Sequence, residues 1–341
     1  MIFGRDIGID LGTATVVVSA RGKGIVTREP SVVAMDKNTG RLLKVGIAAQ
    51  RMLGRTPGNI AAIHPLSGGV ISDFDMTERM IRELIRKVIS FSLVKPRIII
   101  SVPSGITEVE ERAVVDAGIS AGARKVYLME EPVAAALGAG LDISKADGNM
   151  VVDVGAGTTD IAVISLSGVV QSESIKVAGD AFDDAIIKYV RKKHSLLIGK
   201  TTAEEIKKSI GCVFPKPDDV SVEIKGRCLM TGLPRMVSIS SAETIEAFDE
   251  VSEQIVESIH RVLEETPPEL VADISENGIV LTGGGSLVWG FDKLVESSTS
   301  IKTRVADDAD MCVAYGINKS LEFINDMQEG PLNLSRRRQM R

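Results

Sequence analysis

Several residue types are scarce in this chain of 341 residues, and each scarcity excludes a class of protein. Three cysteines, an odd number without paired spacing, and three histidines argue against a disulfide scaffold and a zinc site. No apolar run approaches the ~20 residues of a membrane-spanning helix, and the N-terminus lacks a signal-peptide pattern. A net charge of -6 disfavours a nucleic-acid surface, which would be basic. We therefore expect a cytoplasmic chain that does not cross a membrane and binds no nucleic acid.

The residues that are present predict an α/β protein. Hydrophobic residues make up 44% of the chain, enough for two domains with a core each. Strands are expected up to about Gly46, and then at 98–102 and 126–129. Helical spacing of apolar residues, a Thr107–Glu110 capping box and a proline at 132 predict helices at 76–91, from 107, and at 132–137, 182–194, 203–210, 244–263 and 310–327. Strands and helices alternate, which is typical of the α/β class.

The most informative feature is a repeat. The segment Ile7–Thr13, IGIDLGT, is echoed by Val151–Asp160, VVDVGAGTTD. Each segment is an apolar strand that ends in an aspartate and a tight turn of glycine and threonine. Each is followed by a second apolar strand, a glycine turn and a third apolar segment. Two similar hairpins predict two similar domains that face each other across a cleft.

The residues of the two turns are suited to binding a nucleoside triphosphate and Mg²⁺. Glycine lets backbone N–H groups approach phosphate oxygens closely, and Mg²⁺ prefers one or two carboxylates and keeps most of its waters. Asp10 and Asp153 are the candidate metal ligands, through water. The candidate phosphate ligands are Gly12, Thr13, Ala14, Gly155, Ala156, Gly157, Thr158 and Thr159.

An ordinary hairpin turn is the alternative interpretation, because aspartate and glycine are common in such turns. One glycine turn would be weak support for a ligand site. Two copies with matched aspartate and threonine are harder to explain by turn conformation alone. Neither copy matches the Walker pattern GxxxxGK[ST] or the dinucleotide pattern GxGxxG, so those folds are disfavoured.

The two turns resemble the phosphate loops of the actin, Hsp70 and sugar-kinase superfamily, and Gly278–Ser286 resembles its adenosine-binding strand and glycine turn. Further segments are similar to the MreB/Mbl family of bacterial actins, and the resemblance runs from Phe3 to about Asp326. They are Glu29–Ala34, Gly54–Pro57, Glu130–Ala136, Gly148–Asp153 and Thr266–Leu270. The resemblance implies an actin-like ATPase fold, with two related ribonuclease-H-like domains around a nucleotide cleft, each carrying a small inserted subdomain.

The resemblance also implies where the domains begin and end. The first core domain would comprise 1–32, 67–147 and 309–327, with an inserted subdomain at 33–66. The second core domain would comprise 148–180 and 241–308, with an inserted subdomain at 181–240. A basic tail would follow at 328–341.

The resemblance assigns further site residues. Glu131, rather than Glu130, would arrange the water that attacks the γ-phosphate; alternatively, both glutamates simply favour a helix N-terminus. Glu204 and Lys207 would contact the adenosine, although a charged helical face is usually just solvated. The full set expected near adenosine and ribose is Gly179, Asp180, Glu204, Lys207, Gly283, Gly284, Gly285 and Ser286.

Two surface features are expected by the same resemblance. Phe91, Leu93 and Val94 would form a membrane-inserting loop, which could instead be a buried connection. Val109 would lie on the helix that pairs two protofilaments, unless it is buried in the core. The arginine-rich tail could add attraction to anionic lipid, although short basic termini are often without structure.

The function implied is that of an ATP- and Mg²⁺-dependent filament. The chain would form a homopolymer of paired protofilaments, hydrolyse ATP slowly, and lie peripherally on lipid at the inner face of the cytoplasmic membrane. With MreC, MreD and RodZ it would organise lateral cell-wall synthesis and maintain rod shape. The rivals are a plasmid-segregating actin, which would need a DNA-bound adaptor, an Hsp70-like chaperone, which would need a peptide-binding region, and a sugar kinase, which would need an acidic base.

The chain departs from the family pattern at two places in the phosphate loops. Thr15 and Val16 replace Asn and Thr of the first loop, and Ala156 replaces the middle of three glycines in the second. If the Ala156 position requires a positive φ, alanine would be strained by roughly 1–2 kcal/mol. Neither change removes a proposed ligand, so the expected consequence is confined to the hydrolysis rate.

Overall fold

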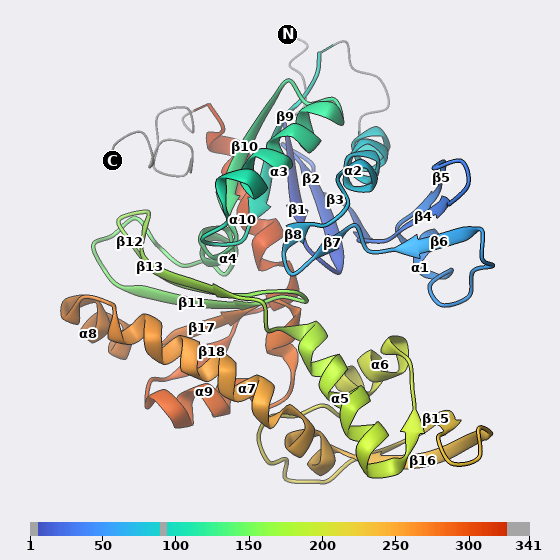
Figure 1. Cartoon of the computed structure of the whole chain (residues 1–341). Helices are drawn as coiled ribbons and strands as arrows, with labels where there is room; N and C mark the ends of the chain where they lie inside the picture. Colours follow the sequence, from blue (N-terminus) through green and yellow to red (C-terminus); the bar gives the residue numbers. More distant parts are fainter. Residues whose placement is uncertain (1–5, 89–93, 326–341) are drawn as a thin grey trace.

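The computed structural model describes residues 6–88 and 94–325, which fold into two lobes (Figure 1). Each lobe is built on a five-stranded sheet. The first has the order β10-β9-β1-β2-β3 and the second the order β13-β12-β11-β17-β18. The strands of the first sheet are β1 (Ile7–Leu11), β2 (Thr15–Ala20), β3 (Gly24–Pro30), β9 (Arg97–Val102) and β10 (Lys125–Glu130). Those of the second are β11 (Asn149–Val154), β12 (Thr159–Ser165), β13 (Gly168–Ile175), β17 (Ile279–Thr282) and β18 (Thr303–Val305).

The predicted repeat is confirmed strand by strand. In both sheets the first strand pairs antiparallel with the second and parallel with a later strand, β9 or β17. In both sheets the pairing of the second and third strands contains a register shift, between Val18 and Ser19 in the first lobe and between Val163 and Ile164 in the second. The two turns that follow β1 and β11 are therefore equivalent positions of equivalent sheets.

The first lobe is completed by helices and a small insertion. Helix α2 (Phe74–Val88) buries one apolar stripe in the core of the first sheet, as its spacing predicts, and α3 (Glu108–Ser120) begins at the capping box of Thr107 and Glu110. The insertion contains β4 (Val33–Asp36), β5 (Leu42–Val45), α1 (Ile47–Gln50) and β6 (Ile60–Ile63). A two-stranded sheet of β7 (Leu66–Ser67) and β8 (Val70–Ile71) follows it.

The second lobe carries its own insertion, seen at the lower right of Figure 1. It contains α5 (Gly179–His194), β14 (Leu196–Leu197), α6 (Lys200–Ile210), β15 (Ser221–Cys228) and β16 (Pro234–Ser240). The long helix α7 (Ser241–Glu264) then crosses below the second sheet, starting at a second capping box on Ser240. Two helices that the sequence analysis did not predict complete this lobe, α8 (Pro268–Asn277) and α9 (Phe291–Thr299), with a short 3-10 helix η1 (Gly284–Leu287).

The chain returns to the first lobe at its C-terminal end, where α10 (Cys312–Ser320) packs against α4 (Glu131–Gly138). Glycines permit this approach, because a Cβ on Gly138 would lie 1.7 Å from the Cys312 carbonyl oxygen and one on Gly316 would lie 1.8 Å from the Ala134 oxygen. The prediction of one helix over 310–327 is wrong. Within the described residues it is divided into η2 (Ala309–Met311), α10 and η3 (Leu321–Phe323).

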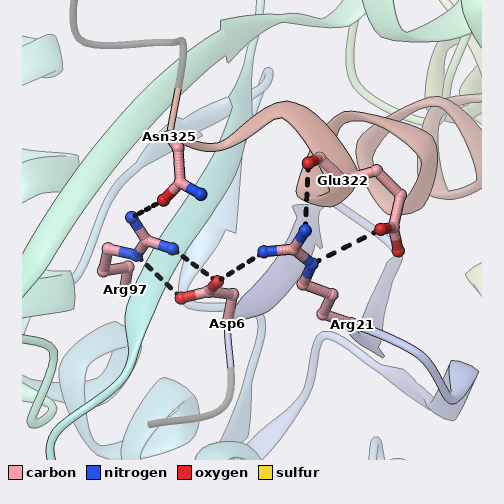
Figure 2. A network of polar contacts seen from close by, with 5 residues as sticks. All are labelled: Asp6, Arg21, Arg97, Glu322 and Asn325. Carbon is pink, nitrogen blue, oxygen red and sulfur yellow. Dashed lines mark hydrogen bonds and ion pairs between the residues drawn. The ribbon is translucent and has the colours of Figure 1, made fainter. Parts of the chain in front are cut away.

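An ion-pair network fastens this C-terminal segment to the first sheet (Figure 2). Arg97 donates two hydrogen bonds to Asp6, at 2.8 and 2.6 Å, and a third to Asn325 at 2.7 Å. Arg21 lies 3.6 Å from the same aspartate and donates to the Glu322 carbonyl oxygen at 3.1 Å. The Asp6 carboxylate raises the pKa of the Arg97 guanidinium further.

In the described part of the chain, no helix is long and apolar enough to span a membrane.

Candidate functional site

A cavity of about 420 Å³ lies between the two lobes and is lined by both turns of the repeat. All of the predicted phosphate ligands except Thr159 line it. The first lobe contributes Gly12, Thr13 and Ala14 and the second contributes Gly155, Ala156, Gly157 and Thr158. The hairpins of the two sheets therefore bring turns about 145 positions apart in the sequence to opposite sides of one cavity, as the repeat predicts.

Glycine is required where the two turns meet. A Cβ on Gly157 would lie 2.6 Å from the Thr13 hydroxyl oxygen, and a Cβ on Gly12 would lie 2.8 Å from the Thr15 carbonyl oxygen. The Thr13 hydroxyl also accepts a hydrogen bond of 2.9 Å from the Gly69 N–H, which fixes its place between the lobes. The strain considered for Ala156 is absent, because Ala156 is not among the residues with positive φ. These turns present backbone where a side chain would fill the space.

The two predicted metal ligands stand behind the turns. Asp10 Oδ1 accepts a hydrogen bond of 3.1 Å from Ser101, and Asp153 Oδ1 accepts one of 2.8 Å from the buried Thr282. Burial raises the pKa of Asp10 to about 6, against the lowering effects of the Ser101 hydrogen bond and of the Arg28 charge. Burial raises the pKa of Asp153 to about 7; its bond from Thr282 lowers it, and nearby carboxylates raise it again.

Glu131 is the first residue of α4 and its carboxylate joins the same acidic group. Its side chain lines the cavity and is almost fully buried. Burial raises the pKa of Glu131 well above its usual range, and the charges of Asp160, Asp153 and Asp10 raise it further. A buried carboxyl facing the phosphate turns is suitably placed to hold a water molecule.

The sequence analysis missed Asp160 as a site residue. Asp160 is fully buried and its Oδ1 accepts a hydrogen bond of 2.7 Å from the Ser104 N–H, whereas Oδ2 has no hydrogen-bond partner. Burial raises its pKa to about 6. Strand register was the available signal, because Asp160 lies directly opposite Asp153 in the β11–β12 pair.

This crowding of carboxylates fits a divalent cation. Burial raises the pKa values of all four acids, Asp10, Glu131, Asp153 and Asp160, and the charges of neighbouring carboxylates raise those of the last three further. In the described residues no three His, Cys, Asp or Glu side chains converge closely enough to coordinate a metal directly. A Mg²⁺ ion here would therefore complete its shell with water and phosphate oxygens, which is the coordination that this ion favours.

Six of the eight predicted adenosine residues line the cavity from the second lobe. Gly283 adopts φ +81°, and a Cβ there would lie 2.3 Å from the Val154 oxygen, so the turn after β17 needs glycine. Lys207 donates to the Gly179 oxygen at 2.7 Å and lies 2.9 Å from Asp183. The six residues that line the cavity are Gly179, Glu204, Lys207, Gly283, Gly284 and Gly285.

Three predicted ligands do not line the cavity but support its loops. The Thr159 hydroxyl donates to the Val177 oxygen at 2.7 Å, and the Ser286 hydroxyl donates to the Gly283 oxygen at 2.7 Å. Asp180 is exposed, and its N–H donates to the Ala156 oxygen at 2.8 Å. Each of these three hydrogen bonds stabilises a loop beside the cavity.

Three further charged residues line the cavity without having been predicted: Arg28, Lys208 and Asp310. Arg28 on β3 and Asp310 on η2 form an ion pair of 2.7 Å. The Arg28–Asp310 pair could not be predicted, since its members are 282 positions apart and belong to no motif.

Of the predicted surface residues, the two that the structure describes, Val94 and Val109, do not line the cavity. Val109 is 78% exposed on α3, which excludes the core alternative for this residue. Val94 is half-buried, and Phe91 and Leu93 lie outside the described residues.

The fold and the paired turns define an actin-like protein. A model of the MreB/Mbl protein family matches residues 4–329, so the chain belongs to the MreB/Mbl family. It is 48% identical to the cell shape-determining protein Mbl of Bacillus subtilis strain 168, over 97% of this chain and 100% of that protein. It is 49% identical to the cell shape-determining protein MreB of Escherichia coli K12, over 97% of each chain.

Solved structures of bacterial actins are similar to this chain. The structure resembles MreB5 of Spiroplasma citri bound to ADP, with a TM-score of 0.92 and 36% identity over 97% of this chain and 100% of that one. The same MreB5 bound to AMPPNP matches with a TM-score of 0.89 and 37% identity, over 96% and 98% of the two chains. A chain of the MamK double helical filament, 21% identical with a TM-score of 0.81 over 94% and 99%, shares the fold.

Proposed function

We propose that this chain is a cell-shape-determining bacterial actin that binds ATP with Mg²⁺ in the cavity and assembles into filaments. The observation that carries the proposal is the pair of equivalent glycine turns facing each other across the cavity, with Asp10 and Asp153 behind them. Converging backbone N–H groups suit phosphate oxygens, and the carboxylates suit a hydrated Mg²⁺. The nucleotides bound by the 36–37% identical MreB5 support the same use of this cavity.

Slow hydrolysis of ATP is the reaction that we assign to the site. Phosphoryl transfer to water needs little covalent help from the protein, but it needs a water molecule in line with the γ-phosphate. Glu131 would hold this water from the first turn of α4, and Mg²⁺ would neutralise charge on the phosphates. Gly283, Gly284 and Gly285 would leave room for the adenosine, with Glu204 and Lys207 on the opposite wall.

Self-assembly and a membrane site complete the proposal. Relatives named as cell shape-determining proteins support a role in shape, and the exposed Val109 on α3 supports pairing of protofilaments. Filaments would lie on the inner face of the cytoplasmic membrane through the Phe91–Val94 segment. Many weak apolar contacts along one filament add through avidity. MreC, MreD and RodZ would be the partners that connect the filament to lateral cell-wall synthesis.

Electron microscopy of the purified protein with anionic liposomes tests this function. Filaments on lipid that require ATP and Mg²⁺, and that leave the lipid in a Leu93→Ser, Val94→Ser variant, are expected. Val170→Ser, which changes an exposed apolar residue on β13 of the second lobe, is the matched control and should leave filaments on the lipid. Absence of filaments at any concentration, with ATP still bound, would instead favour a chaperone-like or kinase-like ATPase.

A further inference from the structure

The cationic side chains that line the cavity are unevenly distributed. Among the described lining residues they are Arg28, Lys207 and Lys208. Both lysines stand on α6 in the second lobe and are engaged there, Lys207 by Asp183 at 2.9 Å and Lys208 by Glu204 at 2.6 Å. Arg28 is the one cation that the first lobe contributes to the described wall. Its place near the phosphate turns needs an explanation.

Strand register puts Arg28 on the same face as the metal site. Asp10 pairs with Val17, and Val17 pairs with Arg28, so the three residues form one row across β1, β2 and β3. Residues in such a row project to the same side of the sheet. Two strand spacings, about 10 Å, separate the Cα atoms of Asp10 and Arg28. The Arg28 side chain, at the end of this row, lines the cavity, and its charge lowers the pKa of Asp10.

The partner of Arg28 belongs to the opposite wall. Asp310 Oδ2 lies 2.7 Å from Arg28 Nη2, and the preceding residue, Ala309, accepts a hydrogen bond of 2.8 Å from the Gly283 N–H. The pair is accessible to water, with side-chain exposures of 48% for Arg28 and 31% for Asp310. Ion pairs that are this exposed are weak and are screened by salt. The contact can therefore be exchanged for a stronger one.

We propose that Arg28 is a further nucleotide-binding residue, which exchanges Asp310 for a phosphate group when a nucleotide enters. The inference rests on the function proposed above. A guanidinium binds phosphate through two parallel hydrogen bonds, and a polyphosphate carries more negative charge than one carboxylate. Asp310 thereby acts as a competitor that holds the arginine in place while the cavity contains no nucleotide.

The same ion pair has an alternative role as a clasp between the lobes, because β3 belongs to one lobe and η2 is bonded to the glycine turn of the other. The two roles predict opposite effects of removing Asp310 on the affinity for nucleotide. A competitor weakens nucleotide binding, so its removal strengthens it. A clasp favours the closed cleft, so removal of either partner weakens binding.

Calorimetric titration of Mg²⁺ and ATP into single and double variants separates these roles. We expect Arg28→Gln to weaken ATP binding roughly tenfold, the effect of one lost hydrogen-bonded charge contact. Asp310→Asn should tighten binding roughly threefold, the value of an exposed ion pair. The double variant should bind ATP as weakly as Arg28→Gln, since the tighter binding of Asp310→Asn depends on the presence of Arg28. Arg28→Lys, which keeps the charge but not the fork, should fall between wild type and Arg28→Gln.

The Arg261–Glu173 pair is a matched control. Its separation is 2.7 Å and its exposures are 49% and 29%, and neither residue lines the cavity. Arg261→Gln and Glu173→Gln should leave ATP affinity unchanged, and thermal melting of each nucleotide-free variant checks that it folds. Wild-type protein that fails to bind ATP would refute the proposed function itself.

Three results with an ATP-binding wild type would overturn the role of Arg28 alone. The first is an unchanged affinity in Arg28→Gln. The second is a weaker affinity in Asp310→Asn, which would establish the clasp. The third is a gain from Asp310→Asn that persists in the Arg28→Gln background, which would make Asp310 a general negative charge without a specific partner.

Discussion

Glu131 begins α4 with its carboxyl facing three other acidic groups and the phosphate turns. We expect Glu131→Gln to lower ATP hydrolysis about 100-fold, because an amide keeps the shape of the side chain but cannot accept a proton from the water. ATP binding should persist, since the glycine turns are unchanged. Phosphate release and nucleotide binding, measured on the same samples, check both expectations.

The neighbouring glutamate provides the control for this prediction. Glu130 ends β10 and accepts a hydrogen bond of 3.3 Å from the Ser104 hydroxyl, but it does not line the cavity. Glu130→Gln should therefore hydrolyse ATP at nearly the wild-type rate. Equal losses in the two variants would mean that both glutamates merely stabilise the start of the helix.

Asp153 makes the stability of the metal-free protein depend on pH. Its pKa is about 7 in the folded protein and about 3.9 when unfolded. Between these values the folded state binds more protons, so the free energy of unfolding falls as pH rises from about 4 to 7. The free energy of unfolding, measured with urea at a series of pH values, should fall less steeply with pH in Asp153→Asn, because its amide does not titrate. Parallel curves for the two proteins would contradict this assignment.

Sequence reasoning reached one set of site residues through the repeat, and another, including Glu131, Glu204 and Lys207, through the family resemblance. Asp10, Asp153 and the glycine turns could be found because each occurs twice with the same neighbours. Asp160 needed the strand register, which places it opposite Asp153. Arg28 and Asp310 could not be found at all, because an ion pair between residues 282 positions apart leaves no local pattern.

At the scale of elements, the crossing of α4 and α10 depends on two glycines. A Cβ on Gly316 would lie 1.8 Å from the Ala134 oxygen. Helix propensity alone would make Gly316→Ala stabilising by about 1 kcal/mol, whereas overpacking against a backbone atom costs about 3 kcal/mol. We expect packing to dominate and the free energy of unfolding, measured with urea, to fall by about 2 kcal/mol.

Gly58→Ala is the matched substitution in open space. No atom lies within 4 Å of a Cβ at this position and its φ is not positive. Its stability should stay the same or rise by about 0.5 kcal/mol, through the loss of chain entropy in the unfolded state. A Gly316→Ala protein as stable as Gly58→Ala would show that the two helices can move apart without cost.

Elements with strong local signals were predicted well. Helices α2, α3 and α7 combine an apolar stripe with capping boxes or acidic first turns. The final helix was predicted as too long, because apolar residues continue beyond Ser320 although the backbone tightens there into a 3-10 turn. Helices α8 and α9 were missed because each is short and buries few residues, Ile274 in α8 and Phe291 and Val295 in α9.

At the scale of the whole molecule, the repeated sheets make one lobe a copy of the other, and the Asp6 network in Figure 2 holds the end of the chain on the first copy. The repeat could be predicted from sequence because it preserves strand order and turn chemistry. The network could not, since its hydrogen bonds join residues 91 to 301 positions apart, which leave no local pattern.

Assembly is the property of the whole molecule that Val109 tests. An apolar side chain that is 78% exposed contributes little to the folded monomer, so Val109→Glu should change the free energy of unfolding by less than about 0.5 kcal/mol. If α3 pairs two protofilaments, a buried unpaired charge there is costly. Electron microscopy should then show single protofilaments for Val109→Glu and paired ones for Val109→Leu, which keeps the contact apolar. Paired filaments in both variants would place the protofilament contact on another face of the molecule.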